Sequence, residues 1–562
     1  MTFHKILIRM VVVVLRLKKE IRWRMGKVQE IKDSVQEIRD SETGQQIVEK
    51  SRKGIFHIIF GRTGIIILMV LIQAACLFLA FGKLQEYVIY AYWAFSLLSA
   101  ATVIVIINRP GNPAFKLAWM VPMTVVPVFG VLLYIFVETQ IGTRIMNSRL
   151  SQVSREMRPF LVKREQVYEK LEQEDKQMSN LASYMADKGG GFPVFDNCQV
   201  TYFPLGEDKF QMLVEELEKA EKFIFMEYFI VAEGRMWNTV HEILKRKAAE
   251  GVEIRFMYDG TCTVSLLPHT YPNRLRAEGI MCKVFNPIKP ALSTTQNNRD
   301  HRKIVVIDGH TAFTGGINLA DEYINEKERF GHWKDTAVMI KGEAVRSFTW
   351  MFLQLWNYDM KGENYEKYLN VEVPAPQEER EGYVIPYGDS PLDTESVGEL
   401  VYMDILNTAR DYVHIMTPYL ILDNEMITAL TYAAKRGVDV KIIMPGIPDK
   451  VYAFALAKTY YPELLRAGVK IYQYELGFVH AKVFTSDDNK AVVGTINLDY
   501  RSLYLHFECA ALLYKIDEIE KIEEDFQETL KQCREITMEE YKKEKLITRF
   551  SGRMLRLFAP LM

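Results

Sequence analysis

Two copies of one sparse pattern contain the side chains best suited to chemistry. Each copy reads H-x-K-x-x-x-x-D, followed after seven residues by Gly and after three more by Asn. The first copy comprises His301, Lys303, Asp308, Gly315 and Asn318, and the second comprises His480, Lys482, Asp487, Gly494 and Asn497. Because the internal offsets are identical, we interpret the two copies as one catalytic constellation that is built from a repeat.

The residue types in this constellation suit displacement at phosphorus. A neutral imidazole can attack a phosphodiester and form a covalent phosphohistidine, which divides one difficult displacement into two easier ones. A second, protonated imidazole can protonate the leaving alkoxide and later accept the proton of the incoming alcohol. The lysines and asparagines can stabilise charge on the phosphate oxygens. The pattern predicts a two-histidine mechanism that uses no metal and no cofactor.

The spacing within the motif is that of a β-strand, in which residues i and i+2 point to the same face. Each histidine should therefore project together with its lysine, whereas Asp308 and Asp487 have the opposite parity. We include these aspartates in the catalytic motif but expect them to fix the backbone or a turn without contacting substrate. The motif glycines begin the next segment, where a bend could aim Asn318 and Asn497 into the same cleft.

Each catalytic imidazole needs an acceptor for its second ring nitrogen, which fixes the tautomer. The candidates are Asp335 in the segment HWKD and Glu508 in the segment HFEC, and the alternative for both is a surface or structural carboxylate. The remaining histidines belong to no repeat, and we expect them to be structural: His4, His57, His241, His269, His310, His332, His414 and His506.

The segments that must position these residues also repeat. An apolar strand, a helix and a second apolar strand follow one another between residues 223 and 260, and again between 413 and 446. A βαβ unit that is used twice predicts an α/β fold with mixed sheets flanked by helices. We expect one domain at 191–370 and the other at 395–562, separated by a proline-containing linker at 371–394.

The N-terminal part of the chain predicts a membrane-embedded region at 61–140. Charged residues become rare there, and three apolar runs each approach the length of about 20 residues that a helix needs to cross the hydrocarbon layer. Pro122 and Pro127 allow the third run to be a re-entrant segment instead of a span. We therefore expect transmembrane helices in the runs 64–82 and 87–107, and either a span or a re-entrant segment in the run 118–137.

Basic residues flank this region on both sides. A basic extension at 1–60 precedes it, and a polar connector at 141–190 follows it. Because positive charge marks the cytoplasmic side of a membrane, we expect a multi-pass protein of the cell membrane with cytoplasmic catalytic domains; an external catalytic part is the alternative. The C-terminal run 549–562 alternates arginines with apolar residues, and it could lie on an anionic membrane surface or pack as an ordinary terminal helix.

The overall charge argues against a nucleic-acid partner. The chain has 70 Lys and Arg against 72 Asp and Glu, which gives a formal net charge of −2. Its six cysteines show no metal-ligand spacing and are too sparse for a disulfide framework in 562 residues. Any basic site must therefore be local, and we expect no structural metal.

With these features together, the chain resembles the phospholipase D superfamily, whose HKD signature the paired motifs match. Within that superfamily it is similar to bacterial cardiolipin synthases over nearly its full length. The stretches that carry the resemblance include NPAFKLAWMVPMTVVPVFGVLLYIFV, TYFPLGEDKF, FMEYFI, QNNRDHRKIVVIDG, FTGGINLADEY, FGHWKDT, YGDSPLD and GTINLDYRS. This coverage is more specific than the two motifs alone.

The resemblance implies a bilobal pseudo-dimer with one active site between its halves. It implies phosphatidylglycerol as donor and acceptor, cardiolipin and glycerol as products, and a phosphatidyl-histidine intermediate. By analogy His301 would be the nucleophile and His480 the general acid, with the reverse left open. The superfamily pattern has Ser after each motif glycine, whereas Gly316 and Thr495 occupy those places here, so a hydroxyl contact to phosphate is in doubt in the first half.

Other functions share this chemistry, because fold and motif do not fix the acceptor. A phospholipase D-type hydrolase or another phosphatidyltransferase would use the same residues. The apolar N-terminal region and the neutral net charge disfavour a nuclease. An inactive membrane scaffold would tolerate loss of a motif histidine or lysine, yet both sets are intact.

Overall fold

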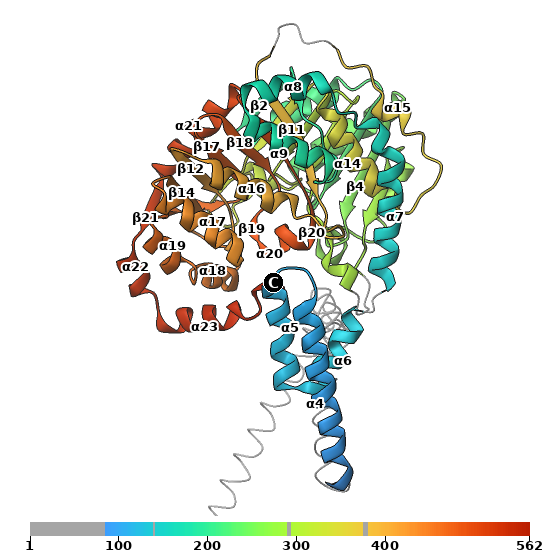
Figure 1. The fold of residues 1–562 in the computed structure, drawn as a ribbon. Helices are drawn as coiled ribbons and strands as arrows, with labels where there is room; N and C mark the ends of the chain where they lie inside the picture. The colour runs from blue at the N-terminus through green and yellow to red at the C-terminus, as the bar shows by residue number, and fades with distance from the viewer. Residues whose placement is uncertain (1–84, 139–140, 289–293, 375–379, 562) are drawn as a thin grey trace, which may run out of the picture. The chain divides into compact units, whose positions relative to one another are not determined.

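The computed structural model describes residues 85–138, 141–288, 294–374 and 380–561 (Figure 1). The chain divides into two units, of which the second, Trp93–Ile288 with Ser293–Met562, contains both motif copies. The predicted apolar run 64–82 and the basic extension lie outside the described residues.

Three helices cover the second and third predicted membrane runs. Helix α4 spans Gln85–Asn108, α5 spans Pro113–Val125, and α6 spans Pro127–Glu138. The break at Val126 and Pro127 divides the run 118–137, whereas Pro122 lies inside α5, so that α5 and α6 each extend only about 20 Å. Among the described residues, no helix combines the length and hydropathy needed to cross a bilayer. The expected spans at 87–107 and 118–137 are therefore not confirmed.

The first half is a mixed sheet in which a parallel βαβ unit joins antiparallel strands. Its strand order is β2-β10-β8-β7-β3-β4-β5, with β3, β4 and β5 parallel. The strands are β2 (Gln199–Phe203), β3 (Phe223–Tyr228), β4 (Glu253–Asp259), β5 (Met281–Phe285), β7 (Ile304–Ile307), β8 (Thr311–Gly315) and β10 (Ala337–Lys341).

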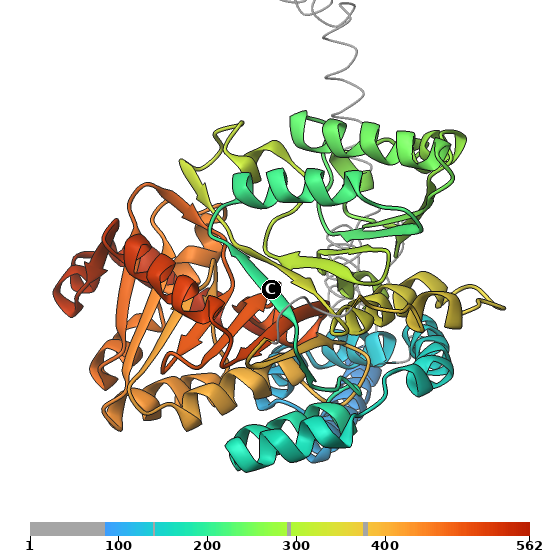
Figure 2. The same ribbon diagram turned by 90° about the horizontal axis from the view of Figure 1, so that it is seen from above.

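Helices cover both faces of this sheet (Figure 2). Helices α10 (Gly206–Glu218) and α11 (Arg235–Ala249) contact one face, and α14 (Val345–Asn357) contacts the other. The motif strand β7 alternates accordingly, because Ile304 and Val306 join one hydrophobic core while Val305 and Ile307 join the other. Burial on both faces explains the unbroken apolar sequence of this strand.

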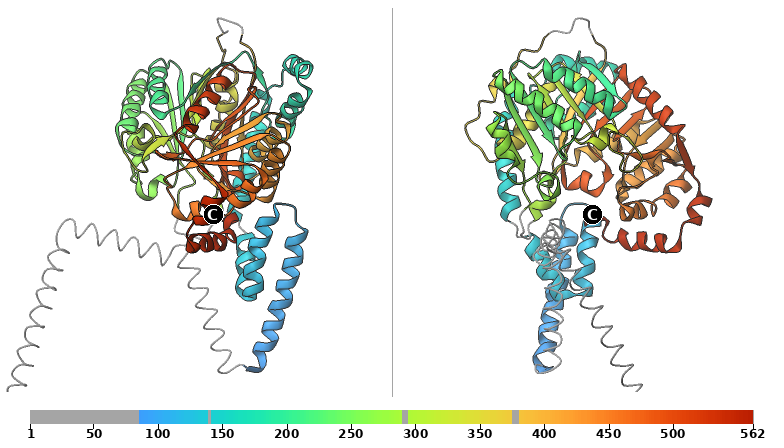
Figure 3. Two further views of the ribbon diagram at one scale, coloured as in Figure 1. Left: turned by 90° about the vertical axis from the view of Figure 1, so that its left-hand side faces the viewer. Right: turned by 180° about the vertical axis from the view of Figure 1, so that it is seen from behind.

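The second half repeats the plan around a larger sheet of order β1-β11-β20-β18-β17-β12-β14-β15-β21 (Figure 3). Strands β12, β14 and β15 are parallel, as are their counterparts β3, β4 and β5. The strands are β1 (Phe195–Asp196), β11 (Tyr383–Asp389), β12 (Tyr412–Met416), β14 (Asp439–Pro445), β15 (Lys470–Tyr474), β17 (Val483–Ser486), β18 (Lys490–Gly494), β20 (His506–Tyr514) and β21 (Cys533–Ile536).

Helices also flank the second sheet. They are α16 (Val397–Thr408), α17 (Asn424–Lys435), α18 (Val451–Ala457), α19 (Tyr461–Ala467) and α21 (Glu518–Leu530). The expected α/β architecture with mixed sheets and two repeated segments is thus confirmed. Two strands cross the expected boundaries: β11 lies within the stretch 371–394, and β1 precedes the first sheet in sequence but pairs with β11.

Two short parallel pairings join the halves. Strand β6 (Arg299–Asp300) pairs with the start of β20, and β9 (His332–Lys334) pairs with β16 (Gly477–Val479). Each pairing places the residues that follow one strand beside the opposite half. His301 directly follows β6, and His480 directly follows β16. Each motif histidine therefore comes directly after a strand that is hydrogen-bonded to the other half.

Candidate active site

The first motif histidine is fixed by the second half of the chain. The His301 N–H donates to the carbonyl of Phe507 at 2.9 Å, which continues the β6–β20 pairing. Its ring Nδ1 lies 2.9 Å from both carboxylate oxygens of Glu508, and the Glu508 side chain is fully buried. The ring also packs edge-on against Phe229. Nε2 is therefore the ring nitrogen left for chemistry.

The second motif histidine is fixed by the first half in the same way. The His480 N–H donates to the carbonyl of Lys334 at 2.7 Å, and Nδ1 lies 2.6 Å from Oδ2 of Asp335. The rings of Trp333 and Tyr323 lie 5.5 Å from the imidazole. Both predicted acceptors are thus in place, and each serves the histidine of the opposite half.

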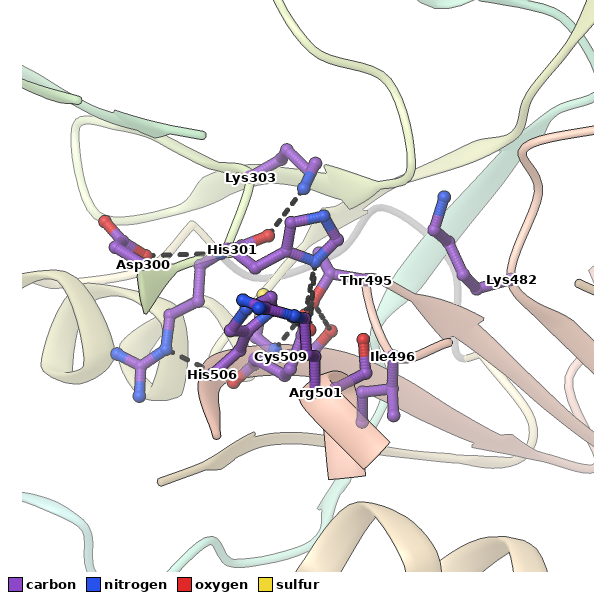
Figure 4. A network of polar contacts seen from close by, with 12 residues as sticks. Asp300, His301, Lys303, Lys482, Thr495, Ile496, Arg501, His506 and Cys509 are labelled. Atoms are coloured by element: carbon purple, nitrogen blue, oxygen red, sulfur yellow. Dashed lines mark hydrogen bonds and ion pairs between the residues drawn. The ribbon is translucent and has the colours of Figure 1, made fainter. Parts of the chain in front are cut away.

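The two motif lysines lie beside the histidines as predicted, but both pairs lie in the segment just before a strand, β7 or β17, and not within it. Lys303 Nζ donates to the carbonyl of His301 at 2.6 Å, and Lys482 Nζ donates to the carbonyl of His480 and lies 2.8 Å from its Nδ1. Figure 4 shows His301 between the Lys303 and Lys482 side chains. Burial lowers the pKa of Lys303 to about 8 and that of Lys482 to about 7.

The two histidine–carboxylate pairs differ in charge. Burial lowers the pKa of His301 to about 3, and the pKa of His480 is well below its usual value because of burial and the adjacent Lys482. Burial acts to raise the pKa of Glu508, but the His301 imidazole holds it well below its ordinary range. Burial raises the pKa of Asp335 to about 6. The first pair thus retains an ionised carboxylate, whereas the second can exchange a proton near neutral pH.

The residues after the motif glycines also differ between the two sites. The Thr495 hydroxyl donates to Glu508, and the Cys509 N–H donates to the Thr495 hydroxyl at 3.0 Å. In the first half a Cβ atom on Gly316 would come within 2.0 Å of Asp335 Oδ1. The absence of a side chain at Gly316 therefore leaves room for the Asp335 carboxylate.

The motif aspartates hold the backbone and do not reach the histidines. Both have φ values in the left-handed region, at 53° for Asp308 and 52° for Asp487, next to a strand turn. Each carboxylate accepts three successive backbone N–H groups at 2.7–3.0 Å: those of Glu221, Lys222 and Phe223 for Asp308, and those of Arg410, Asp411 and Tyr412 for Asp487. Each aspartate thus ties the motif hairpin to the start of the neighbouring βαβ unit.

The motif asparagines have different surroundings. Asn318 accepts from the Ile230 N–H at 2.9 Å and donates to the hydroxyl of Tyr323 at 2.7 Å, so it positions the ring that packs on His480. Asn497 is buried, and its Oδ1 has no hydrogen-bond partner within the described part of the chain.

The motif glycines allow neighbouring strands to lie very close to one another. A Cβ on Gly315, which has φ of 146°, would lie 2.3 Å from the carbonyl oxygen of Thr336, and one on Gly494 would lie 2.6 Å from the Cα of Ala510. The glycines are therefore required by packing beside the site.

Sequence reasoning missed His506. Its ring centroid lies 5.5 Å from that of His301, and its Nδ1 lies 3.6 Å from Glu508 Oε1. Because His506 and Glu508 are two residues apart on β20, strand parity could have placed them on one face. A search restricted to residues that repeat in both halves does not find His506, because it has no counterpart in the first half.

Comparison with protein families gives separate matches for the two halves of the repeat and for the N-terminal helices. Residues 213–356 and 402–530 match the family described as "Cardiolipin synthase, PLD-like domain". Residues 97–138 match the family described as "Phospholipase_D-nuclease N-terminal". The first match includes every motif residue named above, and the second falls on the helices α4 to α6.

Full-length relatives extend this likeness. The chain is 35% identical to cardiolipin synthase 2 of Bacillus anthracis over 82% of this chain and 89% of that protein. It is 35% identical to a cardiolipin synthase of Geobacillus kaustophilus over 83% of this chain and 92% of that protein. An uncharacterized protein of Streptococcus mutans is 53% identical over 82% of this chain and 99% of its own length.

A solved structure supports the fold. The phosphatidylserine synthase of Haemophilus influenzae superposes with a TM-score of 0.52 over 69% of this chain and 98% of its own, at 16% identity. Taken with the family match and with relatives above 30% identity, these likenesses show that the chain belongs to the cardiolipin synthase family of phospholipase D-like proteins.

Proposed function

We propose that the protein is a cardiolipin synthase, a phosphatidyltransferase that converts two phosphatidylglycerol molecules into cardiolipin and glycerol. The observation that carries this proposal is the pair of buried histidine–carboxylate contacts, each of which is formed across the repeat. Such pairs supply one nucleophile and one acid–base group to a single phosphodiester. The named relatives are cardiolipin synthases, which supports this choice of donor and acceptor.

In the first step Nε2 of His301 attacks the phosphorus of one phosphatidylglycerol. The P–O bond to the headgroup glycerol breaks, and His480 gives its proton to the departing glycerol oxygen. The ionised Glu508 stabilises the positive charge that develops on the His301 ring. Lys303 and Lys482 offset the negative charge on the phosphate oxygens. This step leaves a phosphatidyl-histidine.

In the second step a headgroup hydroxyl of another phosphatidylglycerol attacks the same phosphorus. His480 is now neutral and accepts the hydroxyl proton, while the P–N bond to His301 breaks. One phosphodiester bond is lost and one is gained, so no energy-rich co-substrate is consumed. The reaction is reversible for the same reason.

The unequal carboxylates support His301 as the nucleophile. An ionised Glu508 suits a ring that must carry positive charge in the intermediate, whereas Asp335, with a pKa of about 6, suits a pair that exchanges a proton in each step. An anionic phosphodiester beside His480 favours its protonated form, which the buried ring disfavours in the absence of substrate.

Membrane association is part of this proposal, because both substrates are lipids. Helix α23 (Leu546–Arg556) exposes a row of large apolar side chains, among them Leu546 and Phe550, which are 79% and 64% exposed. Gly552 lies on its packed side, where a Cβ would come within 2.4 Å of the carbonyl oxygen of Ala455 in α18. The apolar side of α23 therefore faces outward, and Arg553 and Arg556 flank it.

The apolar helices α4 to α6 support attachment to a bilayer. Their exposed apolar residues include Tyr90, Trp93, Leu97, Ile104 and Val125. The basic residues that flank residues 61–140 favour a cytoplasmic location for the catalytic halves. Multi-pass insertion rests on the sequence pattern, which lies partly outside the described residues.

The test is conversion of labelled phosphatidylglycerol by the purified full-length protein in detergent micelles, with separation of the lipid products. We expect cardiolipin and glycerol from the wild type, and from a His310→Ala control at the far end of the motif hairpin. We expect neither product from His301→Ala or His480→Ala. Phosphatidic acid as the main product would show that water is the acceptor and would contradict the transferase proposal.

A further inference from the structure

The imidazole of His506 lies in the candidate active site with its side chain only 10% exposed. Neither ring nitrogen has a hydrogen-bond partner in the described part of the chain. A buried polar group that makes no hydrogen bond costs about 1–3 kcal/mol, so its retention needs a reason. The ring faces His301 and lies near Phe229.

The surroundings of this ring have the composition of a transition-metal site. One ligand atom from each of His301, His506 and Glu508 lies within 4.8 Å of the other two, and this is the one such cluster of three in the described residues. Two imidazoles and one carboxylate form a donor set common in zinc sites. Tetrahedral Zn²⁺ bonded at about 2.0–2.1 Å needs ligand atoms about 3.3 Å apart.

The observed separations bracket that value. Nδ1 of His301 lies 2.9 Å from the Glu508 oxygens, and Nδ1 of His506 lies 3.6 Å from Oε1. These two separations are within a few tenths of an ångström of the tetrahedral value, and the ligand nitrogens of the two imidazoles lie within 4.8 Å of one another, so side-chain shifts can bring the three ligands to three corners of a tetrahedron. The fourth corner is left to water or to a lipid phosphate. His480 and Asp335 lack a third donor of this kind among the described residues.

We propose that His301, His506 and Glu508 form an inhibitory binding site for Zn²⁺ and similar divalent transition-metal cations. The metal would occupy Nδ1 of His301 in place of the proton that Glu508 now accepts. The ring proton then moves to Nε2, the atom that must attack phosphorus, and a protonated Nε2 cannot be a nucleophile. No bond to substrate forms or breaks, and removal of the metal restores the original tautomer. The inhibitory effect rests on the proposed function, whereas metal binding does not.

Binding is tested first, without turnover. Full-length protein in detergent is stripped with EDTA and titrated with Co²⁺, whose visible absorption reports tetrahedral coordination, and Zn²⁺ is then added as competitor. We expect cobalt bands in the wild type and their displacement by Zn²⁺. His506→Asn should weaken both affinities by at least about tenfold, and His310→Asn should bind as the wild type does.

Equal binding by His506→Asn and wild type, or no tetrahedral spectrum in the wild type, would overturn the proposal. His506→Gln repeats the test if the first variant fails to fold, as judged by thermal unfolding. Cardiolipin formation is then measured against Zn²⁺ concentration, each variant relative to its own metal-free rate. We expect wild-type inhibition that EDTA reverses, and at least about tenfold more Zn²⁺ for half-inhibition of His506→Asn.

The two arms separate the possible failures. If Zn²⁺ binds through His506 but leaves cardiolipin formation unchanged, the inhibitory role is refuted. If no variant forms cardiolipin under any condition, the proposed function fails, while the cobalt titration still decides the metal site.

Discussion

Replacing Glu508 by glutamine tests the role of the ionised carboxylate beside His301. The change keeps the size of the side chain and removes its charge. The carboxylate now accepts from Nδ1 at 2.9 Å through either oxygen, and it has no exposed surface. A charge-assisted hydrogen bond contributes about 1.5–3 kcal/mol, which corresponds to about 10–150-fold in rate if it acts in the transition state.

A second loss adds to the first. The glutamine NH₂ group can donate to Nδ1, which would move the ring proton to Nε2 and disable the nucleophile. In a Ser-His-Asp triad a comparable change of tautomer lowers kcat by about 10⁴. We therefore expect kcat for cardiolipin formation by Glu508→Gln to fall by about 10²–10⁴, with a smaller change in KM.

The assay is initial-rate cardiolipin formation in mixed micelles at saturating phosphatidylglycerol. Glu520→Gln, on the exposed side of α21, is the matched control and should retain wild-type rates. Thermal unfolding of each variant checks that the fold is intact. A well-folded Glu508→Gln protein within about threefold of the wild-type kcat would refute the reasoning about the charged carboxylate.

Three further predictions concern pH, the motif aspartates and the membrane surface. Lys482, with a pKa of about 7, must be charged to stabilise the phosphate oxygens, so kcat/KM should fall above pH 7; Lys482→Arg should move this alkaline limb upward, and an unchanged profile would contradict this assignment. Asp308→Asn weakens three backbone contacts and should lower the free energy of unfolding by about 1–3 kcal/mol in urea titrations while the folded enzyme keeps its kcat; a stable but inactive variant would show a direct catalytic role. Phe550→Glu on α23 should reduce co-flotation of the protein with phosphatidylglycerol vesicles, relative to Ser551→Glu, and equal flotation would remove α23 from the membrane surface.

The spacing of the motif in the sequence predicted much of the site, although each His and Lys lies just before a strand, β7 or β17, and not within it. It grouped each histidine with its lysine and separated Asp308 and Asp487, which do bind backbone N–H groups. The need for a second ring contact identified Asp335 and Glu508. These inferences succeeded because they depend on local geometry and on requirements of the imidazole ring.

Other features depend on contacts that sequence spacing does not reveal. The exchange of acceptors between halves comes from the β6–β20 and β9–β16 pairings, which join residues more than a hundred positions apart. The role of Gly316 became clear only from the 2.0 Å approach that a Cβ would make to Asp335. His506 was overlooked because it has no counterpart in the first half.

The predicted membrane run at 118–137 failed for a different reason. Apolar composition predicted one continuous run at 118–137, but Val126 ends α5 with a non-helical φ of −139° and ψ of 74°, directly before Pro127. Proline disfavours the helical conformation of the residue before it, and this local effect divides the run. Hydropathy alone does not register such a break.

The most direct test of the account is identification of the covalent intermediate. Full-length protein is mixed with phosphatidylglycerol that carries a phosphorus label, quenched under alkaline conditions that preserve phosphohistidine, and digested for mass spectrometry. The account predicts labelled His301 in the wild type and none in His301→Asn. Label on His480, or no label on histidine while cardiolipin still forms, would contradict it.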